Sequence, residues 1–169
     1  MKSFTQRPSE LEKILDFLEK DIENVRKTIK ALENRGLDVE FEVHAKAETV
    51  DESVKHSPVD KNQIIKTLIF KASNSFVAVM CPGDKRVNED KLEKVLGEVR
   101  MASPEEVEKH TEYIIGGVSP FNLDIPLYAS DEIPEGEVRP AGGSRVIGVK
   151  IDREELFEVV GPEVVGITE

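Results

Sequence analysis

The sequence predicts an α+β fold, in which a mixed β-sheet is flanked by helices and preceded by one long helix. Three observations lead to this prediction. Apolar residues recur at steps of three and four along the first 35 residues, which is the period of an amphipathic helix. Two strongly apolar runs of strand length follow at 64–70 and 75–81. After them, helix and strand signals alternate without the regular rhythm of a doubly wound parallel sheet.

The N-terminal helix is the longest element that we expect. Ser9 and Glu12 have the spacing of a capping box, in which each side chain satisfies a free N–H group of the first turn, and Gly36 suits a C-cap. The apolar stripe between these ends consists of Leu11, Ile14, Leu15, Leu18, Ile22, Val25, Ile29 and Leu32. A helical extension packed on the rest of the chain is the favoured interpretation. An arm for a partner is the alternative.

A central β-hairpin is the clearest strand signal. The runs IIKTLIF (64–70) and SFVAVMC (75–81) are separated by a short turn. Before them, 39–43 alternates apolar and polar residues as a half-buried strand does, and Thr49 is placed to begin a short helix. The elements expected after the hairpin are a helix between Asn88 and Gly97, a strand at 99–102, a helix after Ser103, strands at 125–129, 136–140 and 144–151, a helix at 152–160 and a strand near 164–167.

Composition restricts the possible partners and compartments. The formal net charge of −11 argues against non-specific binding of nucleic acid, because phosphate contacts need Lys and Arg. The charge is uneven, however: residues 55–91 carry seven basic and four acidic side chains, which leaves room for a small, directed contact. One cysteine, no apolar stretch of roughly 20 residues and no secretory signal at the N-terminus lead us to expect a cytoplasmic protein without a membrane partner.

Lys66 is the most informative residue of the hairpin. Ile64, Lys66, Leu68 and Phe70 have one parity and should share a face of the sheet, on which Lys66 is the only charge. Lysine is rarely buried without a partner, because its ammonium loses hydration in a low dielectric. Two explanations remain open: a lysine on an edge strand that extends to solvent, or a cation held in a cleft to bind an anion or polarise a carbonyl.

Two glycine pairs are the other candidates for a site. In YIIGGVSPFN (113–122) an apolar strand is expected to end at Gly116 and Gly117, and Pro120 stiffens the turn that follows. Bare N–H groups in such a loop are able to bind a carbonyl oxygen or an oxyanion, although an ordinary tight turn explains the pattern equally well. AGGSR (141–145) is a second glycine pair, expected to form a hairpin turn before a strand.

The sequence offers little for covalent or metal catalysis. His44, His56, His110 and Cys81 lack metal-ligand spacing, so we expect neither a metal nor a cofactor. Motifs of a serine nucleophile elbow, a phosphate-binding P-loop and a dinucleotide-binding turn are missing as well. Cys81 ends an apolar strand and is interpreted as a small buried hydrophobe.

Several linked motifs resemble the YbaK/prolyl-tRNA synthetase-associated editing domain family. They are TVDESVKHSPVDKNQIIKTLIF (49–70), VAVMCPGDKRVNEDKLEKVLG (77–97), ASPEEVEKHTEYIIGGVSPF (102–121) and AGGSR (141–145), in the order and spacing of the family. The resemblance covers about 36–169 and divides the chain into an N-terminal helical extension, 1–35, and an editing domain, 36–169. It implies a curved, barrel-like mixed sheet and the deacylation of mischarged tRNA, typically cysteinyl- or alanyl-tRNA with the proline anticodon, in trans in some members.

The resemblance also implies which residues form the site. The functional lysine of the family corresponds to Lys66, with Thr67 beside it as a substrate contact. The GxxxP loop of the family corresponds to Gly116 and Gly117, with catalytic roles, and to the substrate contacts Val118, Ser119 and Pro120; the later glycine-rich turn corresponds to Ala141, Gly142, Gly143 and Ser144.

These correspondences imply catalysis by positioning. Lys66 would hold the terminal phosphate, the ribose or the ester, and loop N–H groups, helped by Ser144, would hold the scissile carbonyl. Water, assisted by a free hydroxyl of the terminal ribose, would attack the ester, or the thiol of a cysteinyl substrate would attack instead.

Two points remain open at this level. Ser53-Val54 and Ser57-Pro58 stand where many members of the family carry two alanines and Leu-Gly, in a helix that borders the aminoacyl pocket, so the amino acid removed is not fixed. The alternatives to a deacylase are a module that binds aminoacyl-tRNA ends without hydrolysis, and a subunit of a synthetase or editing assembly. The N-terminal helix is the expected contact for tRNA, for a second copy in a homo-oligomer or for a synthetase partner.

Overall fold

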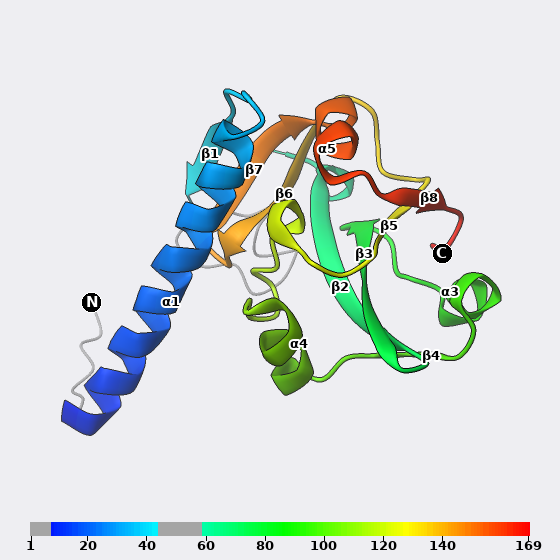
Figure 1. Ribbon diagram of the computed structural model, residues 1–169. Coiled ribbons are helices and arrows are strands. Elements are labelled where there is room, and N and C mark those ends of the chain that lie inside the picture. Colours follow the sequence, from blue (N-terminus) through cyan, green and yellow to red (C-terminus); the bar gives the residue numbers. More distant parts are fainter. Residues whose placement is uncertain (1–7, 44–58) are drawn as a thin grey trace.

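The structure is a computed structural model that describes residues 8–43 and 59–169 (Figure 1). Its helices are α1 (Pro8–Glu33), α3 (Glu89–Leu96), α4 (Pro104–Thr111) and α5 (Arg153–Val160), with two 3₁₀ turns, η1 (Lys61–Gln63) and η2 (Pro120–Asn122). Its strands are β1 (Glu40–Val43), β2 (Ile64–Ala72), β3 (Ser75–Pro82), β4 (Val99–Met101), β5 (Leu127–Ser130), β6 (Glu137–Ser144), β7 (Ile147–Asp152) and β8 (Glu163–Val165). The helix expected from Thr49 lies outside the described residues.

The strands form one mixed sheet in the order β1-β7-β6-β2-β3-β5-β8, with β4 paired to β2. The pairs β1–β7, β6–β7, β2–β3 and β2–β4 are antiparallel, whereas β2–β6, β3–β5 and β5–β8 are parallel. The contact between β2 and β6 is short: its register partners are Ile64 with Arg139 and Ile65 with Pro140. The sheet therefore has two parts, β1-β7-β6 and β2-β3-β5-β8, joined at this short ladder.

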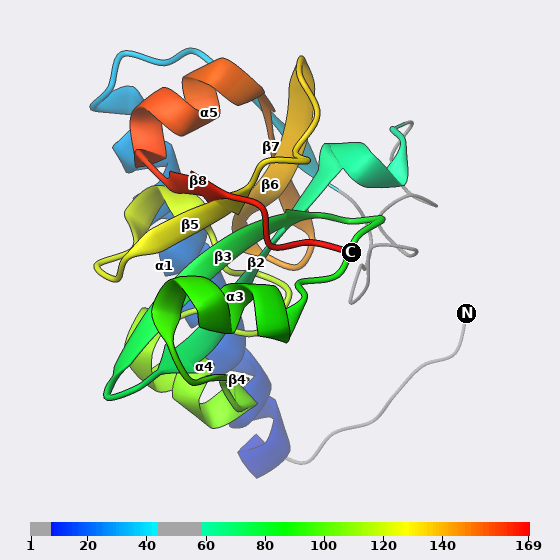
Figure 2. The ribbon, with the colours of Figure 1, turned by 90° about the vertical axis from the view of Figure 1, so that its right-hand side faces the viewer.

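Helices pack on both sides of the β2–β3 hairpin (Figures 1 and 2). One face of β2 carries Ile65, which packs with Leu32 of α1 and Leu156 of α5, and Ile69, which packs with Val107 of α4. The opposite face carries Phe70, which packs with Leu92 of α3. The alternation predicted for 64–70 is thus confirmed, since Ile65, Thr67 and Ile69 are buried while Ile64, Lys66 and Leu68 are half-buried.

The predicted α+β class is confirmed, with an open rather than a closed sheet. The hairpin, the helices that begin after Asn88 and Ser103, and the helix after Asp152 occur where the sequence predicts them. The side chain of each N-cap residue accepts a hydrogen bond from a backbone N–H of the first turn, as predicted for Asn88 and Ser103; Asp152, predicted to lie inside its helix, is a third N-cap.

Two local predictions are wrong. Residues 113–115 do not form a strand; they lead from α4 into a turn in which Gly117 N–H donates to Ile114 O at 3.0 Å. The segment 141–144 is not a turn but the end of strand β6, and the reversal falls on Arg145 and Val146. In both predictions glycine was interpreted as a turn signal or as the end of a strand. At position 143 the reason for a glycine is instead the close approach of another backbone segment.

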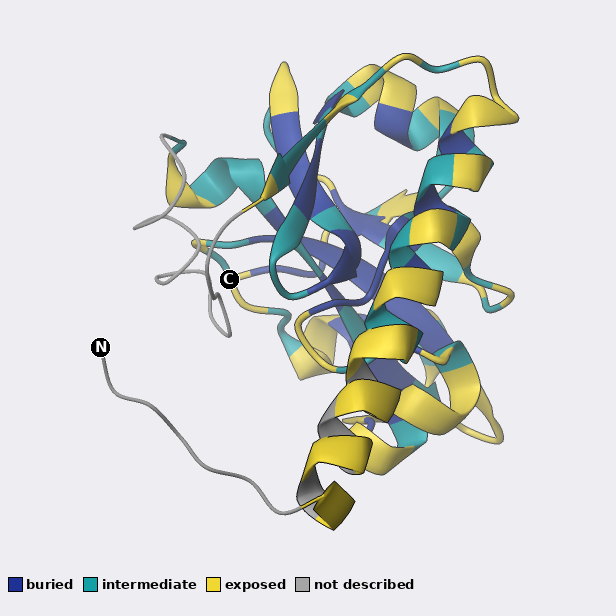
Figure 3. Ribbon diagram, turned by 90° about the vertical axis from the view of Figure 1, so that its left-hand side faces the viewer, coloured by how far each residue is buried: buried dark blue, intermediate teal, exposed yellow. Residues whose placement is uncertain are grey.

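α1 runs beside β6 and β7 (Figure 1), and most of its buried described residues are polar. Its most buried described residues are Asn24, Thr28 and Leu32, of which only Leu32 is apolar. Much of the predicted apolar stripe is instead exposed along the first turns of the helix, as the yellow ribbon in Figure 3 shows. The expectation of a packed extension is therefore correct for the second half of α1, where Leu32 of the stripe is buried together with a polar row, whereas the first half of the stripe is exposed. Within 8–43 and 59–169, no helix has both the length and the apolar character needed to cross a membrane.

Candidate functional site

Lys66 lies where the two parts of the sheet separate. It follows Ile65, the last residue of β2 that pairs with β6, and Ala141 is its counterpart after Pro140 on the neighbouring strand. Across the hairpin, Lys66 is the register partner of Cys81. The Lys66 side chain is half-buried, and no described carboxylate forms an ion pair with its ammonium. By contrast, Arg139, which precedes Ala141 by two residues on β6, has a buried guanidinium whose Nε lies 3.0 Å from Glu42 Oε2.

Cys81 next to Lys66 is not suited to act as a nucleophile. Burial raises the pKa of the Cys81 thiol to about 11, although the positive charge of Lys66 opposes the rise. The Sγ atom lies 3.4 Å from Pro82 O and 3.5 Å from Lys85 O, and its single S–H proton is shared weakly between these two acceptors. The thiol is therefore protonated at neutral pH, in agreement with its interpretation as a small buried hydrophobe.

The two glycine-rich segments of the sequence meet in the structure. A Cβ atom at Gly117 would lie 3.2 Å from Ser144 Cα, so the backbones of the GGVSP loop (116–120) and the AGGS strand end (141–144) are in contact. Arg145 strengthens this contact, because its Nε donates to Ile115 O at 2.8 Å while its stem lies against Gly116. Since β6 also adjoins β2 at Lys66, the AGGS strand end lies between Lys66 and the GGVSP loop.

The GGVSP loop is buried from Gly117 to Pro120, and Gly116 is its exposed end. Val118 packs in the core, Ser119 is fully buried, and Pro120 is buried as the first residue of η2. Gly116 is exposed and has a φ of 89°, a backbone conformation that favours glycine. The Gly117 N–H is committed to the turn, whereas the N–H groups of Gly116 and Val118 find no acceptor among the described residues.

Three polar side chains of α1 fasten these segments. Asp21 accepts a hydrogen bond from Ser144 Oγ at 2.7 Å, Asn24 donates to Glu112 O at 3.1 Å, and Thr28 Oγ1 lies 3.0 Å from Ser119 Oγ. These residues, spaced by three and four positions, face one side of the helix. The Ser144 hydroxyl proton is thus directed to a carboxylate, which favours a role in holding the strand end over the predicted contact with substrate.

Gly143 is the point of closest approach between α1 and β6. Its φ is 103°, and a Cβ atom there would lie 2.8 Å from the backbone C and O atoms of Asn24. A side chain of any size would therefore push α1 away from the AGGS strand end. Glycine at this position is explained by the docking of α1.

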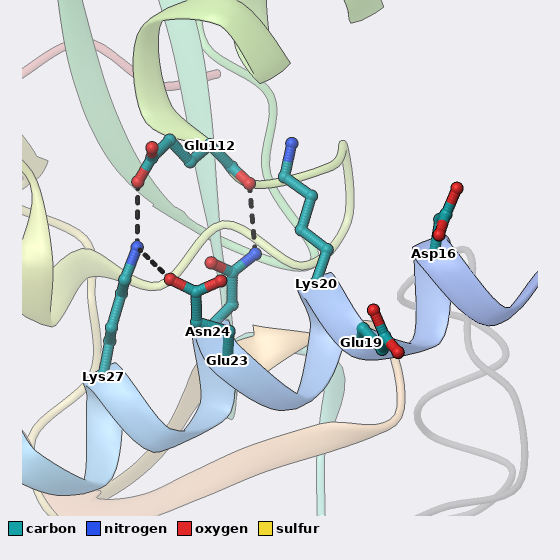
Figure 4. Close-up of a pocket in the computed structure, with 7 residues that line it drawn as sticks. All are labelled: Asp16, Glu19, Lys20, Glu23, Asn24, Lys27 and Glu112. Carbon is teal, nitrogen blue, oxygen red and sulfur yellow. Dashed lines mark hydrogen bonds and ion pairs between the residues drawn. The ribbon is translucent and has the colours of Figure 1, made fainter.

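Ion pairs join α1 to the end of α4 around a hollow of about 300 Å³ (Figure 4). Lys27 lies 2.9 Å from Glu112 and 3.5 Å from Glu23, and Lys20 lies 2.9 Å from Glu108. The hydrogen bond between Lys27 and Glu112 raises the pKa of Lys27 and lowers that of Glu112. These pairs are exposed, so each contributes little to stability, but together they keep α1 in register with the loop that follows α4.

Two buried hydroxyl groups lie near the loop without a hydrogen bond of good geometry. Thr67 on β2 is 9% exposed, and its Oγ1 has no partner in the described part of the chain. Tyr113 is 1% exposed; burial raises the pKa of its phenol, while the nearby polar groups of Ser119, Asn122 and Thr28 oppose the rise. Buried polar groups normally have partners, so Thr67 Oγ1 is a candidate contact for a ligand.

The structure thus brings together most of the residues that the sequence singled out. Ala141, Gly142, Gly143 and Ser144 lie against the 116–120 loop, and β6 joins β2 beside Lys66. Val118 of the loop packs with Ile69, on the face of β2 that also carries Thr67, whereas the Lys66 side chain lies on the opposite face. Sequence reasoning missed Asp21, Asn24 and Thr28. A signal for them existed, because they form a polar row parallel to the apolar stripe of α1.

Comparison with known proteins relates this site to a family. Residues 44–152 match the family described as "Aminoacyl-tRNA editing domain", and they make up more than half of the chain. A stretch of 87 residues, 50% of this chain, is 40% identical to the proline–tRNA ligase of Caldicellulosiruptor bescii, but it spans only 15% of that ligase. A stretch of 131 residues is 33% identical to the uncharacterized protein YwhH of Bacillus subtilis and spans 74% of this chain and 82% of YwhH.

A solved structure shows the same fold. The crystal structure of a proposed trans-editing enzyme for prolyl tRNA synthetase has a TM-score of 0.79 and 30% sequence identity, over 86% of this chain and 97% of that one. The match of 44–152 and the extended similarity to YwhH agree with it. This chain belongs to the aminoacyl-tRNA editing domain family.

Proposed function

We propose that this chain is an aminoacyl-tRNA deacylase that acts in trans, hydrolysing the ester between a wrongly attached amino acid and the terminal ribose of a tRNA. The observation that carries the proposal is the position of the AGGS strand end, which contacts the GGVSP loop and continues from the segment of β6 that pairs with β2 next to Lys66. These are the segments by which the chain resembles its family. The nearly complete overlap with a proposed trans-editing enzyme supports action as a separate protein.

Lys66 and the loop backbone have separate roles in this proposal. The Lys66 ammonium, without a carboxylate partner among the described residues, binds the terminal phosphate or ribose by charge and hydrogen bonding. The N–H groups of Gly116 and Val118 donate to the scissile carbonyl oxygen and stabilise the negative charge that develops on it. Gly117 contributes by letting the loop backbone lie against Ser144.

Water performs the chemical step. It adds to the carbonyl carbon of the ester, the bond to the ribose oxygen breaks, and the ribose oxygen takes up a proton; the products are a free amino acid and a deacylated tRNA. A free hydroxyl of the terminal ribose orients the water. Because the protein supplies position and electrostatic stabilisation rather than a nucleophile, the protonated state of Cys81 does not limit it.

Cysteinyl- and alanyl-tRNA with the proline anticodon are the proposed substrates. The support is the similarity of this chain to a segment of proline–tRNA ligases. Both mischarged tRNAs carry the proline anticodon, as the correctly charged product of such a ligase does. Cysteine and alanine have small side chains, so a pocket that admits them excludes larger residues by size.

Ester loss from a panel of charged tRNAs tests the function. Tritium-labelled Cys-, Ala-, Ser- and Pro-tRNA with the proline anticodon are incubated with the protein and with buffer alone. The proposal predicts that Cys- or Ala-tRNA decays at least tenfold faster with protein, while Pro-tRNA keeps its spontaneous rate. Binding of every charged tRNA without acceleration of any would show a binding module instead of an enzyme.

A further inference from the structure

Four large apolar side chains form an exposed row on the first half of α1. Leu11 is 46% exposed, Leu15 42%, Leu18 47% and Ile22 52%. α1 docks on its own domain through another face, that of Asp21, Asn24 and Thr28. The apolar row is therefore not part of the contact that holds α1 in place, and water contact with it is unfavourable.

The spacing of the row is that of a helix that pairs with another helix. From Leu11 to Ile22 the steps are four, three and four, and the same alternation continues through Val25, Ile29 and Leu32. An alternation of three and four is the a/d seam of a coiled coil, with leucine at d and isoleucine at a in the exposed part apart from Leu15. The seam passes from the buried end of α1, at Leu32, to its exposed end without a break in period.

Opposite charges lie at the two ends of one flank of the seam. The flank carries Glu12, Asp16, Glu19 and Glu23 and, further along, Arg26, Lys30 and Glu33, all exposed. Glu23 pairs with Lys27, whereas Glu12, Arg26 and Lys30 form no ion pair with another side chain in the described ranges. In an antiparallel pair of α1 helices this flank of one copy meets the same flank of the other, which places Glu12 beside Arg26 and Lys30; in a parallel pair it meets the opposite flank instead.

We propose that α1 pairs with α1 of a second copy of this chain to form an antiparallel, two-fold symmetric dimer. Leu18 and Ile22 lie near the two-fold axis, so that Leu11 and Leu15 of each copy reach the Val25–Ile29 part of the other. Such a contact is isologous: one self-complementary stripe serves both copies and closes the assembly at two. The inference depends on α1 alone and holds whether or not the chain is a deacylase.

Sedimentation of the full chain tests the dimer. We expect wild-type protein to have twice the monomer mass of 18.9 kDa at micromolar concentration. Leu18→Glu, which places two carboxylates at the axis, should raise the dissociation constant at least tenfold. Val95→Glu is the matched control, because Val95 is 43% exposed on α3, away from the seam, and this variant should remain a dimer. A monomeric wild type, or a dimer that Leu18→Glu leaves intact, would overturn the proposal.

Charge reversal tests the orientation of the two helices. Glu12→Arg and Arg26→Glu should each weaken the dimer, since each variant puts like charges opposite one another in the antiparallel arrangement. The double variant, Glu12→Arg with Arg26→Glu, restores opposite charges and should recover most of the wild-type dissociation constant. A double variant weaker than both single variants would contradict antiparallel pairing. Circular dichroism of each variant checks that α1 remains helical.

Discussion

Lys66 and Thr67 are neighbours on β2 whose side chains lie on opposite faces of the sheet. Lys66 is half-buried next to Cys81, whereas Thr67 is buried on the face that also carries Ile65 and Ile69. The two residues therefore do not act on a ligand from the same direction. Contact of both residues with the acceptor end of a tRNA requires this end to pass between β2 and β6, where the two strands separate. Thr67 Oγ1 has no hydrogen-bond partner among the described residues.

Thr67→Val tests whether this hydroxyl has a structural role. A buried hydroxyl without a hydrogen bond costs about 1–3 kcal/mol, so we expect the free energy of unfolding to stay the same or to rise by about 1 kcal/mol. Deacylation should nevertheless slow, because the proposed contact with the substrate is lost. Urea unfolding and the tRNA assay measure the two effects on one preparation.

Thr28→Val is the control for a hydroxyl that is already hydrogen-bonded. Thr28 Oγ1 lies 3.0 Å from Ser119 Oγ, so this variant should lose about 1 kcal/mol of stability. A Thr67→Val protein destabilised as much as Thr28→Val would show that Thr67 has a partner in the folded protein, and its assignment to the substrate site would then be abandoned.

α1 is the element whose docking determines the shape of the site. It contacts the AGGS strand end at Gly143, and it holds Ser144 and Ser119 through hydrogen bonds. Val118 holds the GGVSP loop through the core, and Ser119 holds it through Thr28 of α1. The glycine end of the loop, which has no side chains, depends on Arg145.

Gly143→Ala should displace α1. The added methyl group would overlap the Asn24 backbone at 2.8 Å, and we expect a loss of about 2–4 kcal/mol in the free energy of unfolding, together with faster proteolysis of α1. Gly136→Ala is the control that separates the effect of this clash from the effect of a positive φ. Gly136 also has a positive φ, 84°, but open space around it, so its substitution should cost only about 1 kcal/mol. Equal losses in the two variants would mean that α1 does not need the close approach.

The elements that the sequence predicted correctly are those whose signals are local. The side chains of Asn88, Ser103 and Asp152 accept hydrogen bonds from the first turns of the helices they precede, and the apolar runs of β2 and β3 have no competing interpretation. The errors at 113–115 and 141–144 arise from tertiary contacts. Glycine at 117 and 143 allows two backbones to approach, and the approaching segment is remote in sequence.

The candidate site was predictable only in part for the same reason. Lys66 stood out from the sequence because it is the one charge on an apolar strand face, and the structure places it at the junction with β6. The role of Asp21, Asn24 and Thr28 depends on which face of α1 docks. An apolar stripe predicts that face in most helices, but in this chain the polar row is buried against β6 and η2.

At the scale of the whole molecule, the two parts of the sheet meet at the proposed site. β6 brings the AGGS strand end and, through it, α1; β2 brings Lys66, and the loop after α4 brings its backbone N–H groups. A net charge of −11 disfavours a broad tRNA interface, so recognition should concentrate on the acceptor end. In the proposed mechanism, the Lys66 ammonium contributes a large part of the binding of the acceptor end and orients the ester.

Removal of that ammonium tests the central claim most directly. Lys66→Ala and Lys71→Ala are compared with wild type in the Cys- and Ala-tRNA assay, with thermal unfolding as the check on folding. Lys71 is the matched control, because it is a second half-buried lysine of β2, on the opposite face. The account predicts that Lys66→Ala slows deacylation by about 100-fold or more without unfolding the domain, while Lys71→Ala keeps the wild-type rate. Unchanged turnover by Lys66→Ala would contradict it.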